Sequence, residues 1–228
     1  MNRPLLWYYM SANGTKKGRP RRELRDEIIS VAEQAFFSNG IRAVSLEDLV
    51  REIGTSKSAF YRYFEHKSAL VSAVMDRLNQ RMNSDLAEIV DGDLGFSEKL
   101  VAVARYTSAL LNRVNDKFFL DLQSVTPKVW EQYLRARQER VETLYYRLFR
   151  RGQEQGQLRH DLPAPVLTLI YLHMTEMVID PEAIAEFRKH EVDPYEVIQT
   201  VFFLFTQARP IQQSPRRLLK GLEQTSKG

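Results

Sequence analysis

The sequence predicts an all-α protein with a three-helix N-terminal helix-turn-helix domain and a larger C-terminal helical bundle, about nine or ten helices in all. Along most of the 228 residues, apolar side chains recur every three or four positions, the spacing of one buried helix face. Several of these patterns begin at proline, which is favoured in a first helical turn because its missing N–H leaves no hydrogen bond unmade. No run alternates apolar and polar residues as a half-buried strand would, so no sheet is predicted.

The first helix is expected to begin at Arg22 and to end at Gly40. Glycine favours such an end because it adopts the left-handed C-terminal conformation at little cost. The apolar residues before it share one side of the helix and form a predicted buried stripe: Ile28, Val31, Ala32, Ala35 and Phe36.

Two short helices joined at a glycine follow. Ser45 is the expected N-cap of the second helix, which ends at Gly54. The third is expected from Thr55 or Ser56 to about residue 64, with apolar residues one turn apart on its inner side. A fourth helix is expected from about residue 67 to the turn-forming residues 91–95.

The remaining chain is also expected to be helical, apart from its last residues. The expected helices span about 97–115, 117–123, 127–155, 163–179, 181–190 and 194–208. The predicted organisation is a flexible basic arm (1–21), a helix-turn-helix domain (22–70, with the motif at about 45–64), a helical body (71–210), and a flexible tail (211–228).

Composition excludes several classes of protein. The chain has no cysteine, which excludes disulfides, cysteine zinc sites and a thiol nucleophile. No apolar stretch approaches the roughly 20 residues that span a bilayer, and residues 1–10 do not form a convincing signal peptide. We therefore expect a cytoplasmic protein without a membrane partner, metal or cofactor, and no catalytic residue is predicted. Met10 is an alternative start of translation.

The positive charge is concentrated near the N-terminus. Residues 1–67 hold 12 Lys and Arg against 8 Asp and Glu, whereas the rest of the chain holds 21 of each sign. The whole net charge of +4 therefore lies in the first third of the chain. A polyanion bound by this part explains the asymmetry. A solvated basic tail without a partner is the alternative.

The spacing of the two short helices resembles that of the helix-turn-helix motif, which presents its second helix to a DNA major groove. With residue 60 on the buried side, Ser58, Tyr61 and Arg62 project outward, and Thr55, Ser56 and Lys57 stand at the helix N-terminus. Such side chains can bond base edges or phosphates. An ordinary corner between two helices is the other interpretation of the pattern.

The stretches IISVAEQAFFSNG (28–40) and SLEDLVREIG (45–54), continued by TSKSAFYRYFEHK (55–67), resemble the N-terminal domain of TetR-family transcriptional regulators. The most specific part is the series Ser56-Lys57, Phe60-Tyr61, Tyr63-Phe64 and Lys67. The resemblance covers about residues 22–80. It implies a DNA-binding head on a larger helical domain that dimerises and usually binds a small-molecule effector.

Carried over by position, the resemblance implies that Ser45, Tyr63 and Lys67 contact phosphates and that Tyr61 lies between base and backbone. The residues that it turns toward bases are Thr55, Lys57, Ser58 and Ala59. Ser58-Ala59 and Thr55 depart from the commonest residues of the family at these positions, so the operator sequence is not predicted. The segment 17–21 resembles an AT-hook core for a narrow minor groove, and the arm candidates are Lys16, Lys17, Arg19, Arg21 and Arg22.

Two features of the body are candidates for function. Of the last two long helices, the helix of residues 163–179 has one apolar face and the helix of residues 194–208 is apolar on nearly all sides. By resemblance they would form a four-helix bundle with a second copy; a monomer core is the alternative. Aromatic and sulfur side chains provide a possible effector pocket, although at helical spacing such residues more often form core. The pocket candidates are Tyr106, Phe119, Trp130, Tyr146, His173 and Met174.

The sequence therefore predicts a non-enzymatic, homodimeric regulator of transcription that binds double-stranded DNA. The main expectation is a repressor released from a pseudo-palindromic operator by a small molecule. The alternatives are a constitutive DNA-binding dimer without a ligand, and a small-molecule-binding protein or enzyme with an incidental helix-turn-helix. Against the enzyme stands the lack of a phosphate loop or nucleophile elbow in the sequence.

Overall fold

A computed structural model describes residues 21–206, which form helices and turns and contain no strand. This confirms the all-α prediction. The helices at the N-terminal end are α1 (Arg21–Asn39), α2 (Leu46–Ile53), α3 (Lys57–Tyr61) and α4 (Lys67–Asp91). Those of the body are α5 (Phe96–Leu111), α6 (Asp116–Val125), α7 (Pro127–Arg140), α8 (Tyr146–Glu154), α9 (Ala164–Met174), α10 (Pro181–Lys189) and α11 (Pro194–Thr206).

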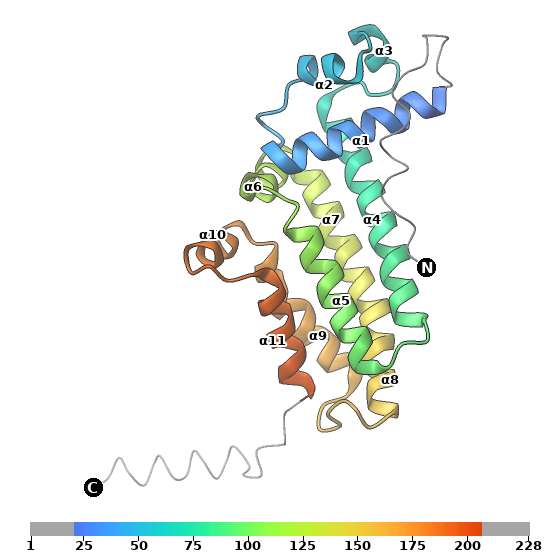
Figure 1. The fold of residues 1–228 in the computed structure, drawn as a ribbon, viewed down its shortest axis with the longest axis vertical. Coiled ribbons are helices and arrows are strands. Elements are labelled where there is room, and N and C mark those ends of the chain that lie inside the picture. The colour runs from blue at the N-terminus through green and yellow to red at the C-terminus, as the bar shows by residue number, and fades with distance from the viewer. Residues whose placement is uncertain (1–20, 207–228) are drawn as a thin grey trace, which may run out of the picture.

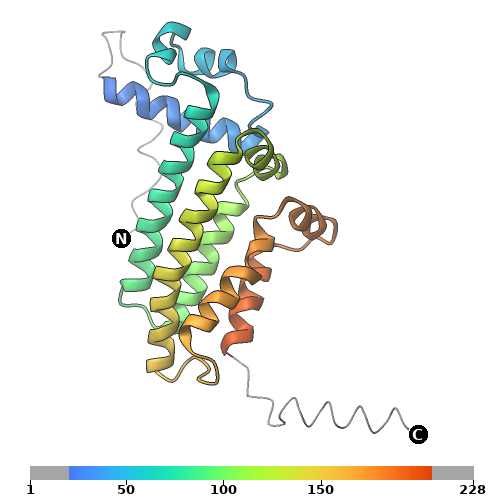
Figure 2. The same ribbon diagram turned by 180° about the vertical axis from the view of Figure 1, so that it is seen from behind.

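The molecule is elongated, with α1, α2 and α3 gathered at one end (Figure 1). Helix α4 starts in this head and runs down the body, where it packs against α5 and α7. The predicted boundary at residues 70 and 71 falls inside α4, so one continuous helix belongs to both parts. Seen from behind, α4, α5 and α7 run side by side, and α9 and α11 cover one flank of the body (Figure 2).

The predicted helix 127–155 is one rod with an irregular centre. A π-helical turn, Val141–Tyr145, joins α7 to α8 without a break. The predicted helix 163–179 is shorter than expected, because α9 ends at Met174 and a 3₁₀ turn (Glu176–Val178) follows. Side chains satisfy the last carbonyl groups of α9: the Thr175 hydroxyl donates to Tyr171 O at 2.7 Å.

A single apolar core runs from the head into the body. Three residues of the predicted α1 stripe, Ile28, Ala32 and Phe36, are completely buried in it. Phe37 makes an edge-to-face contact with Phe118 of α6, with ring centroids 5.0 Å apart. The head is therefore packed onto the body through apolar contacts as well as through α4.

Within residues 21–206, no helix combines the length and the apolar character that crossing a membrane requires. The arm residues Lys16, Lys17 and Arg19, and the predicted tail, lie outside the described residues. Arg21 and Arg22 begin α1, but their side chains are also outside the description.

Candidate nucleic-acid interface and interior cavity

The turn between α2 and α3 is set by local hydrogen bonds. Ser45 caps α2, because its Oγ accepts from Asp48 N at 3.1 Å while the Asp48 carboxylate accepts from Ser45 N. Gly54 ends α2 with φ +68°, a conformation that favours glycine. Ser56 then caps α3 by accepting from Ala59 N at 3.1 Å. The predicted N-cap Ser45 and the predicted helix end at Gly54 are thus confirmed.

Helix α3 lies at the tip of the head (Figure 1). Phe60 is 1% exposed and anchors the helix in the core, whereas Tyr61 is 51% exposed. The other residues of this outward set are exposed too, namely Ser56, Lys57, Ser58 and Arg62. This set has hydroxyls, cations and a phenol, which are the groups that contact base edges and phosphates.

The remaining predicted contacts lie deeper. Ala59 is 8% exposed and packs into the core beside Phe60, so the expectation that it faces bases is corrected. Ser45, Thr55 and Tyr63 are half-buried at the edge of the exposed surface.

Lys67 has a partner inside the protein. Its Nζ donates to Val44 O at 2.5 Å, on the loop before α2, and lies 6.0 Å from the Phe36 ring centroid. Burial lowers the pKa of Lys67, while the Asp121 carboxylate opposes that shift. This carbonyl explains why a lysine opens α4 despite the helix dipole, which disfavours a cation there.

Lys57 is held by an acidic neighbour on α2. Its Nζ lies 2.5 Å from Glu47 Oε1, and both side chains are more than half exposed. The hydrogen bond from Lys57 lowers the pKa of Glu47, so this carboxylate is charged at neutral pH. A phosphate and Glu47 would therefore compete for the same ammonium group.

Glu47→Gln is expected to strengthen binding to any duplex by about two- to fivefold at low salt, because it removes a negative charge that neutralises Lys57. Fluorescence anisotropy with a labelled duplex across a salt titration measures this effect. Glu52→Gln is the matched control, since Glu52 is also exposed on α2 but forms no ion pair with Lys57. Equal effects of both substitutions would contradict the role given to Glu47.

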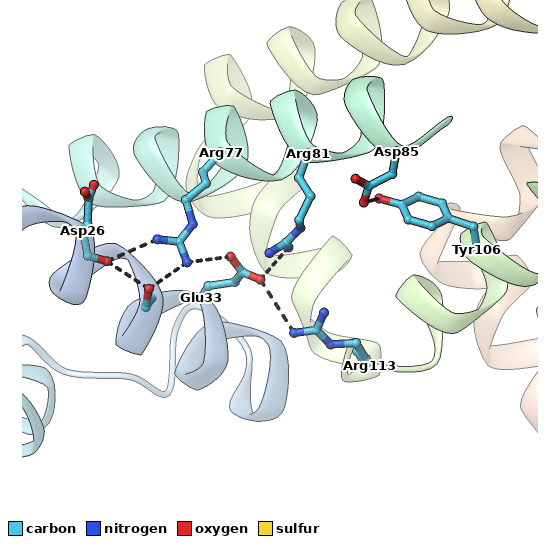
Figure 3. A network of polar contacts seen from close by, with 8 residues as sticks. Asp26, Glu33, Arg77, Arg81, Asp85, Tyr106 and Arg113 are labelled. Carbon is cyan, nitrogen blue, oxygen red and sulfur yellow. Dashed lines mark hydrogen bonds and ion pairs between the residues drawn. The ribbon is translucent and has the colours of Figure 1, made fainter. Parts of the chain in front are cut away.

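A buried carboxylate ties the head to the body (Figure 3). The Glu33 side chain, on α1, is 5% exposed and lies 2.7 Å from Arg81 Nη2 and 3.5 Å from Arg77 Nη2, both on α4. Arg113, between α5 and α6, approaches the same carboxylate at 3.7 Å. Three cations from the body therefore converge on one acidic group of the head.

Glu33→Gln is expected to lower the free energy of unfolding by about 2 kcal/mol, because three arginines lose their shared counter-charge. The loss stays moderate because the arginine side chains are between a third and more than half exposed and can be solvated. Chemical denaturation followed by circular dichroism measures it. Glu23→Gln, on the exposed first turn of α1, is the control and should cost less than about 0.5 kcal/mol.

Helix α6 is the second link between body and head. Asp121 accepts a hydrogen bond from Arg42 N at 2.8 Å, and its other oxygen lies 3.4 Å from Arg42 Nε. At the start of α6, Asn115 N donates to Phe37 O at 2.7 Å. A movement of α6 would therefore move the end of α1 and the loop that leads to α2.

The body contains a small cavity of about 50 Å³ beside α6, with walls from α4, α5, α7 and α9. A wider cleft of about 570 Å³ lies next to it, between the α5–α6 loop and α10. Four residues line both spaces: Leu111, Val114, Phe119 and Val178. The cleft therefore adjoins the inner cavity.

Of the predicted pocket residues, only Phe119 lines these spaces. The Tyr106 hydroxyl donates to Asp85 Oδ2 at 2.8 Å, as Figure 3 shows. Trp130 is half-buried and stacks on Tyr133 at 5.6 Å, and His173 is exposed, with Nδ1 3.6 Å from Glu176. Tyr146 and Met174 are half-buried against the core. The aromatic stripes serve mainly as core, as the alternative interpretation held.

Sequence reasoning missed the polar wall of the cavity. Arg137 and Arg140 line it, and both are buried on the inner side of α7. A signal was present in the sequence. Along the buried side of α7 and the π turn, the two arginines occupy positions between apolar residues, which are Val129, Tyr133, Val141 and Leu144. Two arginines on an otherwise apolar stripe indicate buried charge.

One flank of the body is apolar and exposed. Leu169 is 54% and Phe203 57% exposed, on the neighbouring helices α9 and α11. Val166, on α9, and Met177, in the turn after it, are also exposed, at 38% and 39%. We call these four residues the apolar flank. Exposed apolar surface of this kind is typical of a face that another protein covers.

Comparison with known proteins agrees with these observations. The family model described as "Bacterial regulatory proteins, tetR family" matches residues 28–74, which contain α2, α3 and the start of α4. The transcriptional repressor DrrR1 of Streptomyces coeruleorubidus is 33% identical over 88 residues, and the repressor ComR of Escherichia coli is 34% identical over 103 residues. The matches cover 39% and 44% of this chain.

The chain spans 32% of the length of DrrR1 and 47% of that of ComR, so these similarities concern mainly the N-terminal part. A crystal structure of a TetR-family transcriptional regulator from Agrobacterium tumefaciens superposes with a TM-score of 0.60 at 18% identity. It covers 89% of this chain and 98% of the other chain, so the two share the fold of head and body. The matched residues and the shared fold make this chain similar to bacterial regulatory proteins of the TetR family, in the sequence of its N-terminal part and in its overall fold.

Proposed function

We propose that this protein is a homodimeric, sequence-specific DNA-binding regulator of transcription, and that it represses. The observation that carries the proposal is the outward side of α3, where Ser56, Lys57, Ser58, Tyr61 and Arg62 are exposed on a helix anchored by buried Phe60. A helix of this kind enters a major groove N-terminus first. DrrR1 and ComR are named as repressors, which supports repression over activation.

Dimerisation is supported by the apolar flank. A two-fold axis next to α9 and α11 would place Leu169 and Phe203 against their copies and would remove the exposed apolar surface from water. Two heads would then meet the same side of a duplex. Their recognition helices would be spaced by about one helical turn of DNA, roughly 34–36 Å, or a multiple. The operator would accordingly be a pseudo-palindrome.

The basic arm is proposed to extend the contact into a minor groove. The charge comes from Lys16, Lys17 and Arg19, which precede α1 in the sequence, and from Arg21 and Arg22, which begin it. Narrow A·T-rich minor grooves concentrate negative potential and attract such cations. The arm would raise affinity on A·T-rich flanks more than on G·C-rich flanks.

Release from DNA is proposed to start at the inner cavity. Phe118 and Phe119 of α6 line it, and Phe118 also packs against Phe37 of the head. An effector that enlarges the cavity would displace α6 and, through Asp121 and Arg42, the loop before α2. Changing the spacing of the two heads in this way requires an effector that binds the two dimer geometries with different affinities. The role of the body is thus binding and not catalysis, and a regulator of this kind acts in the cytoplasm.

Selection of bound sequences from a random duplex library tests the proposal. The expected result is a pseudo-palindromic consensus whose half-sites are centred about 10 base pairs, or a multiple, apart. A control selection with Tyr61→Ala and Arg62→Ala together should lose this enrichment, because both side chains lie on the outward side of α3. Enrichment of no sequence, or of single half-sites without symmetry, would contradict the proposed function.

A further inference from the structure

The inner cavity contains two buried cations. Arg137 and Arg140 stand one turn apart on α7, and they are 8% and 4% exposed. Arg137 Nη2 donates to Leu172 O at 3.1 Å and to Thr175 Oγ1 at 2.7 Å. Arg140 Nη1 donates to Asn83 Oδ1 at 2.9 Å. These partners are neutral, and throughout residues 21–206 neither arginine forms an ion pair with a carboxylate.

A counter-charge from the surrounding phenols is excluded by burial. The desolvation of Tyr133 and Tyr171, which also line the cavity, raises the pKa of both, so they stay protonated and neutral. Asp85, on α4, accepts the Tyr106 hydroxyl and forms no ion pair with either arginine. Arginine itself does not lose its proton in proteins. Two positive charges therefore remain inside the body without a matching negative charge.

Uncompensated buried charge is strongly unfavourable, and proteins keep it where a ligand supplies the opposite sign. Arg137 and Arg140 each use one guanidinium nitrogen in the hydrogen bonds described above, which leaves further N–H groups for a ligand. The buried hydroxyl oxygen of Thr107, in the same wall, has no hydrogen-bond partner. The wall thus offers donors arranged for an anion.

The shape of the two spaces restricts the rest of the ligand. The cavity of about 50 Å³ admits a small head group, whereas the adjoining cleft of about 570 Å³ admits a larger body. Leu111, Val114, Phe119 and Val178, which line both spaces, are all apolar. A ligand that fills both would place its charge at the arginines and its apolar part against these residues.

We propose that the effector is an organic anion with an apolar body, and that Arg137 and Arg140 bind its carboxylate. The identification of this anion as the effector rests on the proposed regulatory function, whereas its binding does not. Its head group would lie next to the α6 side of the cavity, where Phe118 contacts Phe37 of the head. Binding there would act on the contact between α6 and α1, and so on the head that carries α3.

Calorimetric titration of the full-length protein without DNA tests the binding step. The probes are sodium decanoate and 4-phenylbutyrate, each compared with its methyl ester and with decyltrimethylammonium. We expect at least one carboxylate to bind at least about tenfold more tightly than its ester, because charge-assisted bonds to arginine are lost in the ester. Equal binding of acid and ester, preference for the ammonium compound, or saturable binding of neither carboxylate would overturn the proposal.

Variants locate the site. Arg137→Gln and Arg140→Gln should each weaken the carboxylate at least about tenfold, and Arg140→Lys should weaken it less, because the charge is kept. Arg135→Gln is the matched control, since Arg135 lies exposed on the same helix beside Glu131, and it should leave binding unchanged. Carboxylate binding that survives both Gln variants would overturn the assignment. If a Gln variant does not fold, two measurements still test the assignment. They are the comparison of acid with ester on the unmodified protein and the affinity of the Arg140→Lys variant for the carboxylate.

A second titration separates this inference from the proposed function. The carboxylate that binds is added to the complex of the protein with its selected duplex, and DNA release is followed by anisotropy. Carboxylate binding in a protein that selects no DNA would refute the regulator and leave the anion site standing. DNA binding in a protein that binds neither carboxylate would refute the anion site alone.

Discussion

Leu169→Glu is expected to turn the dimer into monomers and to lower the affinity for a two-half-site operator by about a hundredfold or more. Leu169 belongs to the apolar flank, and a two-fold axis there would bring two new carboxylates into one interface. Burying an unpaired charge is costly, and here the cost is paid twice per dimer. Each monomer would then contact the operator with one head only. Light scattering after size-exclusion chromatography measures the mass, and anisotropy measures the affinity.

The control for this substitution is Leu94→Glu. Leu94 is similarly exposed, at 47%, but lies in the turn between α4 and α5, outside the apolar flank. It should leave the dimer and the operator affinity unchanged. A Leu169→Glu protein that remains a dimer at micromolar concentration would place the interface between copies elsewhere on the molecule.

Phe60→Ala is expected to lower the free energy of unfolding by about 3–5 kcal/mol and to abolish operator binding. Phe60 is almost completely buried, and its ring packs against Phe64 and Tyr61 at centroid distances of 5.7 and 5.9 Å. Helix α3 has only five residues, so it depends on this anchor for its position. Urea denaturation followed by circular dichroism measures the loss of stability.

Tyr61→Ala is the matched comparison, because it truncates the next aromatic side chain on the outward side of α3. It should cost less than about 1 kcal/mol in stability while still weakening DNA binding. A Phe60→Ala protein as stable as Tyr61→Ala would show that the anchor assigned to α3 is not needed for folding.

The parts of the head that depend on local chemistry could be predicted from the sequence. Ser45 and Ser56 cap helices because their hydroxyls reach backbone N–H groups three residues ahead. Gly54 ends α2 because the turn needs a positive φ. These interactions span a few residues, so a sequence pattern contains all the groups that take part in them.

Features that depend on distant residues could not be predicted in this way. The partner of Lys67 is a carbonyl 23 positions earlier in the chain, and that of Glu33 is an arginine 48 positions later. The inner cavity is lined by residues from five or more helices, so the aromatic residues of single helices do not indicate which side chains line it. His173, a predicted pocket residue, lies at the surface, whereas Arg137, which was not predicted, lies inside. Ala59 shows the same limit on a smaller scale, because its burial follows from how α3 is seated on the head.

The most direct test of the account is to repeat the selection from random duplexes with Lys57→Ala and Ser58→Ala combined, beside Lys128→Ala, which is exposed on α7, as the control. The double variant is expected to change base preference at the same positions in both half-sites, in mirror symmetry, by about 1–3 kcal/mol for each altered base contact. The control should return the wild-type consensus. A double variant that also selects the wild-type consensus would contradict the claim that paired copies of α3 read the DNA sequence.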